Sequence, residues 1–133
     1  MKFKYKRFGA NVLRPVIPVT LEHEGKRIRY DALVDSGADV CIFDAEIGEL
    51  LGLDVESGVR QEVSGLGSGS PEPLYLHEIT LHLGNHTMTL PVAFKAQFAR
   101  FGHGALGQRG FFDRTVVRFD RAAEEVEVVF REL

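Results

Sequence analysis

The sequence predicts an all-β protein whose strands form a closed barrel, with one or two short helices. Most apolar residues fall in short runs that alternate with polar residues, which is the pattern of half-buried strands. Turn-forming glycines separate these runs, and only two segments have the features of a helix. The chain has 133 residues, 44% of them hydrophobic, which is enough for one domain with one core.

The N-terminal segment from Met1 to Phe8 is predicted to be a strand with one side in water, because basic and apolar residues alternate along it. No apolar run follows this segment, so we do not expect a signal peptide. A basic patch that binds a polyanion is the alternative interpretation.

The strands of the barrel are expected where β-rich runs are bounded by turns such as Glu24-Gly25 and Gly84-Asn85. In chain order, these strands cover Val16–Leu21, Lys26–Val34, Val40–Phe43, Val55–Val63, Leu74–Leu83, Thr87–Ala96, Thr115–Phe119 and Val126–Phe130. The run from Leu74 to Leu83 alternates most regularly, which predicts one buried and one exposed side.

Two short helices are expected between these strands. Asp44 is a suitable N-cap for a helix that reaches about Leu51, and Gly52 follows where the helix should end. The second helix is expected around Gln108 to Arg114.

The segment from Ser64 to Pro71 has glycine at three alternate positions, which eases backbone motion. Its length and its flanking strands favour a loop that closes over a ligand. A plain linker or a loose hairpin loop is the alternative, and the glycine spacing does not match a phosphate-binding loop.

The candidate catalytic residue is Asp35, which follows a predicted buried strand and begins the turn Asp35-Ser36-Gly37. Two carboxylates about 3 Å apart cannot both ionise, so they share a proton and act as acid and base together. The chain has only one Asp-Ser-Gly turn, so the second carboxylate has to come from another copy of the protein. The alternative is an aspartate that caps its own turn.

Cys41 is the only cysteine, so no internal disulfide can form, which is consistent with a reducing compartment. Its place in the apolar run Val40–Phe43 predicts a buried side chain, with a nucleophile as the alternative. Four of the five histidines, His77, His82, His86 and His103, raise the hypothesis of a metal-dependent hydrolase. They lack zinc-site spacing, so no metal is expected.

Four features, in order, resemble one known family. They are the motif from Leu33 to Asp39, the apolar continuation Val40–Phe43, the glycine-rich segment Gly65–Gly69, and Ala105-Leu106-Gly107. With these features the chain resembles the retropepsins, the single-domain aspartic proteases of retroviral type that work as homodimers. The resemblance covers roughly Val16 to Phe119.

The resemblance implies a closed acid-protease-like barrel with one lobe per chain. It implies a single retropepsin-like domain over 1–133, with a core over about 14–120, and strands 1–8 and 125–133 are candidates for the dimer interface. The implied site has Asp35 as the catalytic residue, Ser36 and Gly37 as support of the catalytic loop, and Ala38, Asp39, Leu66, Gly67, Ser68 and Gly69 in contact with substrate.

The sequence departs from the family pattern in two places near this site. Gln108 stands where many retropepsins have an arginine that pairs with the residue matching Asp39, and Arg109 follows one position later. Ala105 is smaller than the branched residue that is usual beneath the catalytic loop.

These features together predict an aspartic endopeptidase that hydrolyses peptide bonds with a water held between Asp35 of two subunits. The alternative is a catalytically weak or inactive retropepsin fold that serves as a peptide-binding or dimerisation module. No cofactor is expected, and the partners are a peptide or protein substrate and a second copy of the chain. The net charge of −3 and the absence of an apolar run of about 18 residues argue against nucleic acid and membrane, so we expect a cytoplasmic protein.

Overall fold

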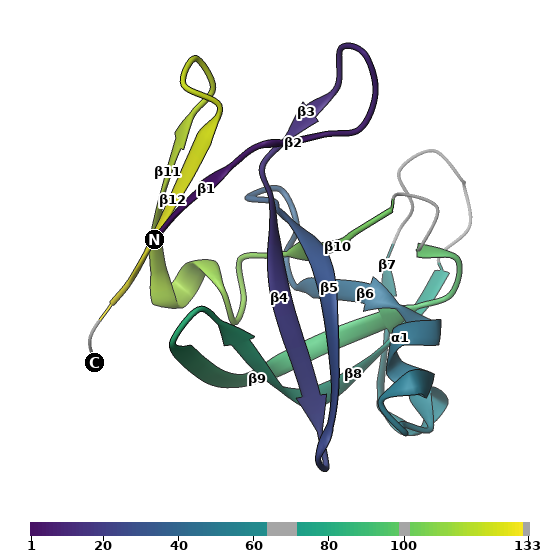
Figure 1. The fold of residues 1–133 in the computed structure, drawn as a ribbon. Coiled ribbons are helices and arrows are strands. Elements are labelled where there is room, and N and C mark those ends of the chain that lie inside the picture. Colours follow the sequence, from purple (N-terminus) through teal and green to yellow (C-terminus); the bar gives the residue numbers. More distant parts are fainter. Residues whose placement is uncertain (64–71, 99–101, 132–133) are drawn as a thin grey trace.

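The computed structural model describes residues 1–63, 72–98 and 102–131, and its main feature is a β-barrel (Figure 1). The strands of the large sheet are β4 (Val16–His23), β5 (Lys26–Val34), β6 (Cys41–Asp44), β7 (Val59–Val63), β8 (Glu72–Leu83), β9 (His86–Lys95) and β10 (Gly104–Leu106). Their order in the sheet is β4-β5-β10-β6-β9-β8-β7, and β4 also pairs with β8. This extra pairing closes a ring of strands, so the predicted all-β closed barrel is confirmed.

The interior of the barrel is filled by every second side chain of its strands, because successive side chains point to opposite faces. In β8 and β9, which pair antiparallel across the predicted Gly84-Asn85 turn, the residues that point inward include Ile79, Leu81 and Leu90, each at most 1% exposed. Phe43 and Phe94 from parallel neighbours β6 and β9 are fully buried beside each other in register. Burying such side chains stabilises the fold by about 1.5–3 kcal/mol each.

The strand β10 lies between β5 and β6, although these two strands follow each other in sequence. It runs parallel to β5, with Ala105 opposite Leu33, and antiparallel to β6, with Ala105 opposite Ile42. The connection from β5 to β6 therefore has to pass around the end of β10. This connection contains the Asp-Ser-Gly turn.

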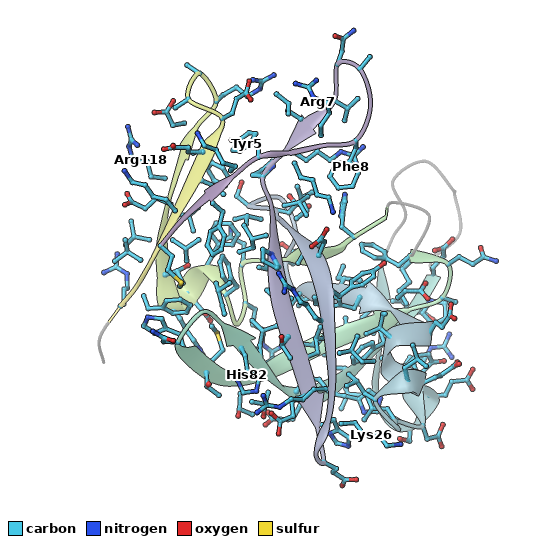
Figure 2. The ribbon with its side chains drawn as sticks, in the orientation of Figure 1. Tyr5, Arg7, Phe8, Lys26, His82 and Arg118 are labelled. Atoms are coloured by element: carbon cyan, nitrogen blue, oxygen red, sulfur yellow. The ribbon has the colours of Figure 1, made fainter. Side chains whose placement is uncertain are left out.

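The two ends of the chain form a second sheet, which we call the terminal sheet. It consists of β1 (Lys2–Lys4), β12 (Glu125–Phe130) and β11 (Thr115–Asp120), in that order (Figure 1). Figure 2 shows Arg118 on the side of this sheet that faces away from the barrel. The predicted strand from Met1 to Phe8 is divided in the structure, because β2 (Lys6–Arg7) pairs with β3 (Leu13–Arg14) instead.

The first predicted helix is confirmed as α1 (Ala45–Leu50). Asp44 caps it by accepting a hydrogen bond of 3.0 Å from the backbone N–H of Glu46. Gly52 follows the helix with a φ of +85°, in the left-handed region that favours glycine. In the described part of the chain, no helix is long and apolar enough to cross a membrane.

The second predicted helix, around Gln108 to Arg114, is confirmed only in part: it is limited to the 3-10 helix η3 (Phe112–Arg114). Gly110 has a φ of +99°, which breaks the right-handed spiral before it can start. The strand predicted over Val55–Val63 is also shorter than expected. It begins as the 3-10 turn η1 (Val55–Ser57), because Ser57 bonds back to the carbonyl of Asp54 through both its N–H and its hydroxyl.

Candidate active site

Asp35 lies directly after β5, at the position where β10 ends beside it. Its backbone N–H donates to the carbonyl of Leu106 at 3.0 Å, and the N–H of Val34 before it donates to Pro15 at 2.9 Å. The turn then closes on itself, since Ala38 N–H donates to the carbonyl of Asp35 at 3.1 Å. Asp35 is thereby held on both sides by backbone hydrogen bonds.

The carboxylate of Asp35 is oriented by its own turn. The backbone N–H of Gly37 donates to Oδ1 at 2.9 Å, and Asp35 itself is half-buried. Within the described residues, Oδ2 has no hydrogen-bond donor from the protein. One oxygen therefore fixes the side chain, and the other is available for a water or for a second carboxyl group.

A second segment holds this turn from the other side, and we call the two segments together the crossing (residues 34–41 and 104–109). Backbone N–H groups of Gln108 and Arg109 donate to the carbonyls of Ala38 and Asp39, at 2.8 and 3.0 Å. Val40 and Arg109 form an isolated parallel bridge. The Asp35 turn is thus bound to a distant segment of the chain. The side-chain bond between Gln108 and Ser36, for example, joins residues 72 positions apart.

Gly107 is required at the centre of the crossing. A Cβ atom at this position would lie 2.3 Å from the carbonyl oxygen of Val40 and 2.7 Å from that of Ala38. Both are backbone atoms of the loop that carries Asp35, so neither can move aside without displacing that loop. Any side chain here would push the two segments apart.

Gln108 is a site residue whose role the sequence did not predict. Its Nε2 donates to the backbone carbonyl of Ser36 at 2.7 Å. The position is the one where many retropepsins have arginine, and here the shorter amide side chain holds the Asp35 turn directly. The only signal in the sequence was the departure from the family pattern.

The ion pair expected from the family pattern is not formed in one chain. Asp39 and Arg109 are both exposed, and the salt bridges found among the described residues do not join them. Their contact is a backbone hydrogen bond, in which the N–H of Arg109 donates to the carbonyl of Asp39. Ala105 is buried, at 4% exposure, between Leu33 and Ile42 in register.

Cys41 is the last residue of the first segment of the crossing and is completely buried. The N–H of Gly107 donates to its sulfur at 3.4 Å, and the thiol points to the carbonyl of Arg109 at 3.9 Å. Burial raises the pKa of the Cys41 thiol to about 11. The predicted buried side chain is confirmed, and a protonated buried thiol is a poor nucleophile.

The four histidines occupy four separate environments. Their partners are the carbonyl of Val55 for His77, Glu22 and Thr87 for His82, the ring of Phe130 for His86, and Arg14 with the carbonyl of Gly104 for His103. No group of three potential metal ligands occurs in residues 1–63, 72–98 and 102–131. The predicted substrate contacts Leu66, Gly67, Ser68 and Gly69 lie outside the described residues.

Comparisons with known proteins agree with this geometry. A family model described as "Aspartyl protease" matches residues 17–109, which include the turn at Asp35 and the whole crossing. In solved structures, the fold is similar to that of EIAV protease complexed with the inhibitor HBY-793. That match has 17% sequence identity and a TM-score of 0.51, and it covers 71% of this chain and 82% of the other.

No curated protein matches the chain in sequence. At the identity found, the structural match shows the fold alone, whereas the family model covers well over half of the chain. The resemblance to retropepsins inferred from the four motifs is confirmed by both. The chain has a retropepsin-like fold and belongs to the aspartyl protease family.

Proposed function

We propose that this protein is an aspartic endopeptidase that acts as a homodimer, with one Asp35 from each chain. The observation that supports it most is the state of the Asp35 carboxylate. Oδ1 is held at 2.9 Å by Gly37, while Oδ2 has no protein donor among the described residues. A rigid, half-exposed carboxylate on a turn that occurs once per chain is half of an acid/base pair.

In the proposed mechanism, two Asp35 side chains share one proton and hold a water between them. The ionised carboxylate removes a proton from the water, and the protonated one donates a hydrogen bond to the carbonyl oxygen of the scissile peptide bond. The water oxygen bonds to the carbonyl carbon, which gives a tetrahedral intermediate. Transfer of a proton to the leaving nitrogen then breaks the carbon–nitrogen bond.

The neighbouring residues have supporting roles in this proposal. Gly37 orients the carboxylate through its N–H, and the exposed Ser36 is positioned to donate a hydrogen bond to the second chain. Ala38 and Asp39 would contact the backbone of an extended peptide substrate. The glycine-rich residues 66–69 would cover that substrate.

The dimer would bring the terminal sheets of two chains together. In one chain β1 and β11 are the outer strands of this sheet, each with an edge that pairs with no described strand. An edge of this kind can pair with the same edge of a second copy. The free edge of β1 lies within segment 1–8, and β12 pairs with β1 from within segment 125–133. We propose that these two segments lie in that interface, with β1 at its edge.

The test compares wild type with Asp35→Asn for cleavage of an unbiased peptide library, with sedimentation to measure the dimer. Asn is isosteric but cannot ionise, so cleavage is expected to fall by at least about a hundredfold while the dimer persists. Asp54→Asn is the matched control, because Asp54 is exposed and its side chain makes no capping hydrogen bond. This control is expected to cleave like wild type.

Equal cleavage by wild type and Asp35→Asn would refute the mechanism. A dimer that binds peptides without cleaving them would instead support a peptide-binding module on the same fold. Since one proton has to be shared by two carboxyl groups, the rate is expected to be highest at mildly acidic pH. A rate independent of pH throughout the range where carboxyl groups titrate would also contradict the proposal.

A further inference from the structure

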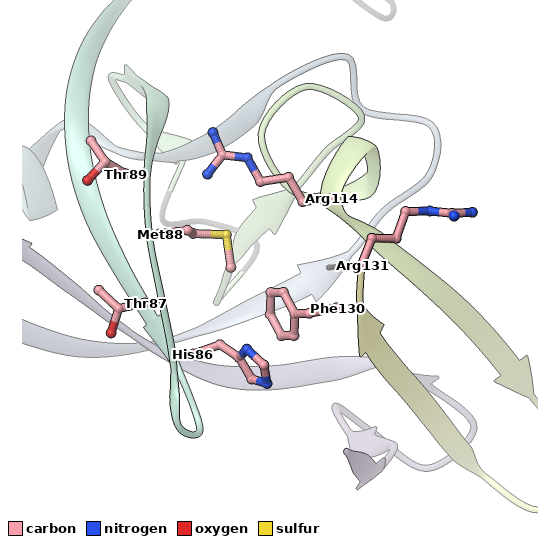
Figure 3. A pocket seen from close by; sticks show the side chains of 7 residues that line it. All are labelled: His86, Thr87, Met88, Thr89, Arg114, Phe130 and Arg131. Atoms are coloured by element: carbon pink, nitrogen blue, oxygen red, sulfur yellow. The ribbon is translucent and has the colours of Figure 1, made fainter. Parts of the chain in front are cut away.

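A surface cavity of about 380 Å³ lies where the start of β9 meets the end of β12, away from the catalytic turn (Figure 3). We propose that this cavity binds a small organic anion, in which a carboxylate or phosphate group is attached to an apolar or aromatic body. None of its lining residues belongs to the crossing. The proposal does not require peptidase activity. Phe130 and Arg131 also lie in segment 125–133 of the proposed dimer interface, so the proposal requires that the dimer leaves this cavity open.

The charge of the lining favours an anion. Two of the lining residues, Arg114 and Arg131, are cationic, and no acidic residue lines the cavity. The backbone brings these arginines together, because the N–H of Arg131 donates to the carbonyl of Arg114 at 2.9 Å. Both side chains add positive charge at this cavity, and positive charge favours the binding of an anion.

The guanidinium of Arg114 is the principal recognition group. Arg114 is half-buried, and among the described residues its side chain makes no ion pair, hydrogen bond or cation–ring contact. Guanidinium has five N–H donors in a planar fork, whose geometry matches the paired oxygens of carboxylate and phosphate. Figure 3 shows the Arg114 guanidinium above Met88, whereas the Arg131 side chain extends outward. Arg131 therefore contributes mainly at longer range.

The rest of the lining suits an apolar body. Met88 is 8% exposed and forms a buried apolar floor below Arg114. The rings of His86 and Phe130 stack with their centroids 4.1 Å apart and their planes 16° apart. An aromatic ring on the ligand could extend this stack.

The experiment uses benzoate and phenyl phosphate as probes, with neutral benzamide as their control. Binding to the full chain is followed by NMR titration, in which the signals of His86, Met88, Thr89 and Phe130 should shift together and saturate. Benzamide has the same ring without the negative charge, so its binding is expected to be at least about tenfold weaker. The two anionic probes separate a carboxylate site from a phosphate site.

Substitutions then identify the groups that bind. Arg114→Gln is expected to weaken binding of the preferred anion about tenfold or more, and Arg131→Gln about two- to fivefold. Arg118→Gln is the matched control, because Arg118 is exposed on the terminal sheet next to Asp120 and carries the same charge. It is expected to leave the affinity unchanged.

Arg114→Lys serves as a second variant in case Arg114→Gln does not fold. It keeps the charge but loses the fork, and is expected to bind more weakly than wild type and more tightly than Arg114→Gln. The proposal is overturned if neither anion shows saturable binding up to about 10 mM, a concentration that corresponds to weak binding at a single site. It is also overturned if benzamide binds as tightly as benzoate. Equal effects of Arg114→Gln and Arg118→Gln on the affinity would overturn it as well.

Discussion

The crossing and the terminal sheet are held together in different ways. In the crossing, backbone contacts the backbone: Leu106 accepts from Asp35, and Ala38 accepts from Gln108. The terminal sheet is instead held to the core by side chains, which alternate between a buried and an exposed side. Val126 and Val128 face the core at 0% and 1% exposure, while the outer face is exposed and carries charged residues together with Val116 and Val129. The close packing of the crossing requires a position without a side chain, Gly107, whereas the packing of the terminal sheet requires side chains that alternate between its two faces.

This difference bears on function. A carboxylate that acts as acid or base has to be held to within a fraction of an ångström, and short backbone hydrogen bonds hold it better than flexible side chains. A strand in the proposed dimer interface has no such demand. It needs an apolar side, a polar side and an edge that can pair.

The largest effect on stability is expected for Gly107→Ala in the crossing. The new Cβ would lie 2.3 Å from the Val40 oxygen, so we expect at least about 3 kcal/mol of lost stability or no folded protein. Gly25→Ala is the control, because a Cβ there meets nothing within 4 Å and only the φ of +84° is unfavourable. Its expected cost is about 1 kcal/mol. Equal costs in urea unfolding would show that the crossing is not tightly packed.

Alkaline pH is expected to weaken the crossing through Cys41. The pKa of this thiol rises from 9.0 in the unfolded chain to about 11 in the fold. Between these values only the unfolded chain loses the proton, so stability falls as pH rises, by about 2 to 3 kcal/mol. Unfolding of wild type and Cys41→Ala is compared from pH 8 to 11. If both lose stability equally, the buried thiol has no part in the effect.

Gln108→Ala tests whether the side-chain bond to Ser36 adds to the backbone bonds of the crossing. The variant removes one exposed hydrogen bond of 2.7 Å, so we expect a loss of about 1 kcal/mol and faster hydrogen exchange at residues 35–38. Gln61→Ala is the control, since Gln61 is exposed on β7. Unchanged exchange at the turn would show that the backbone alone holds it.

The smallest effect is expected on the outer face of the terminal sheet. Lys4 pairs with Glu125 at 3.1 Å, but the Lys4 side chain is 74% exposed. Solvent and salt screen such a pair, so Lys4→Ala should cost less than about 0.5 kcal/mol. A double-mutant cycle with Glu125→Ala at low and high salt measures it. A coupling above 1 kcal/mol would contradict the view that this face contributes little to stability, given the usual range of about 0–1 kcal/mol.

Local features of the fold could be predicted from the sequence because they depend on neighbouring residues. Asp44 and Gly52 bound α1 as expected, since capping involves atoms two to four positions apart. The β8–β9 hairpin follows from its period of two and its turn. The failures at η1 and η3 came from local details that a hydrophobic pattern does not contain, such as the φ of +99° at Gly110.

The sequence by itself determined the strands, the single Asp-Ser-Gly turn and the buried place of Cys41. The tertiary structure alone decided that β10 passes between β5 and β6, that Gln108 holds Ser36, and that Arg114 meets Arg131 beside a cavity. The physical reason is the range of the interactions. Alternation and capping act within a few residues, whereas hydrophobic burial has no direction and leaves strand order to the packing of the whole chain.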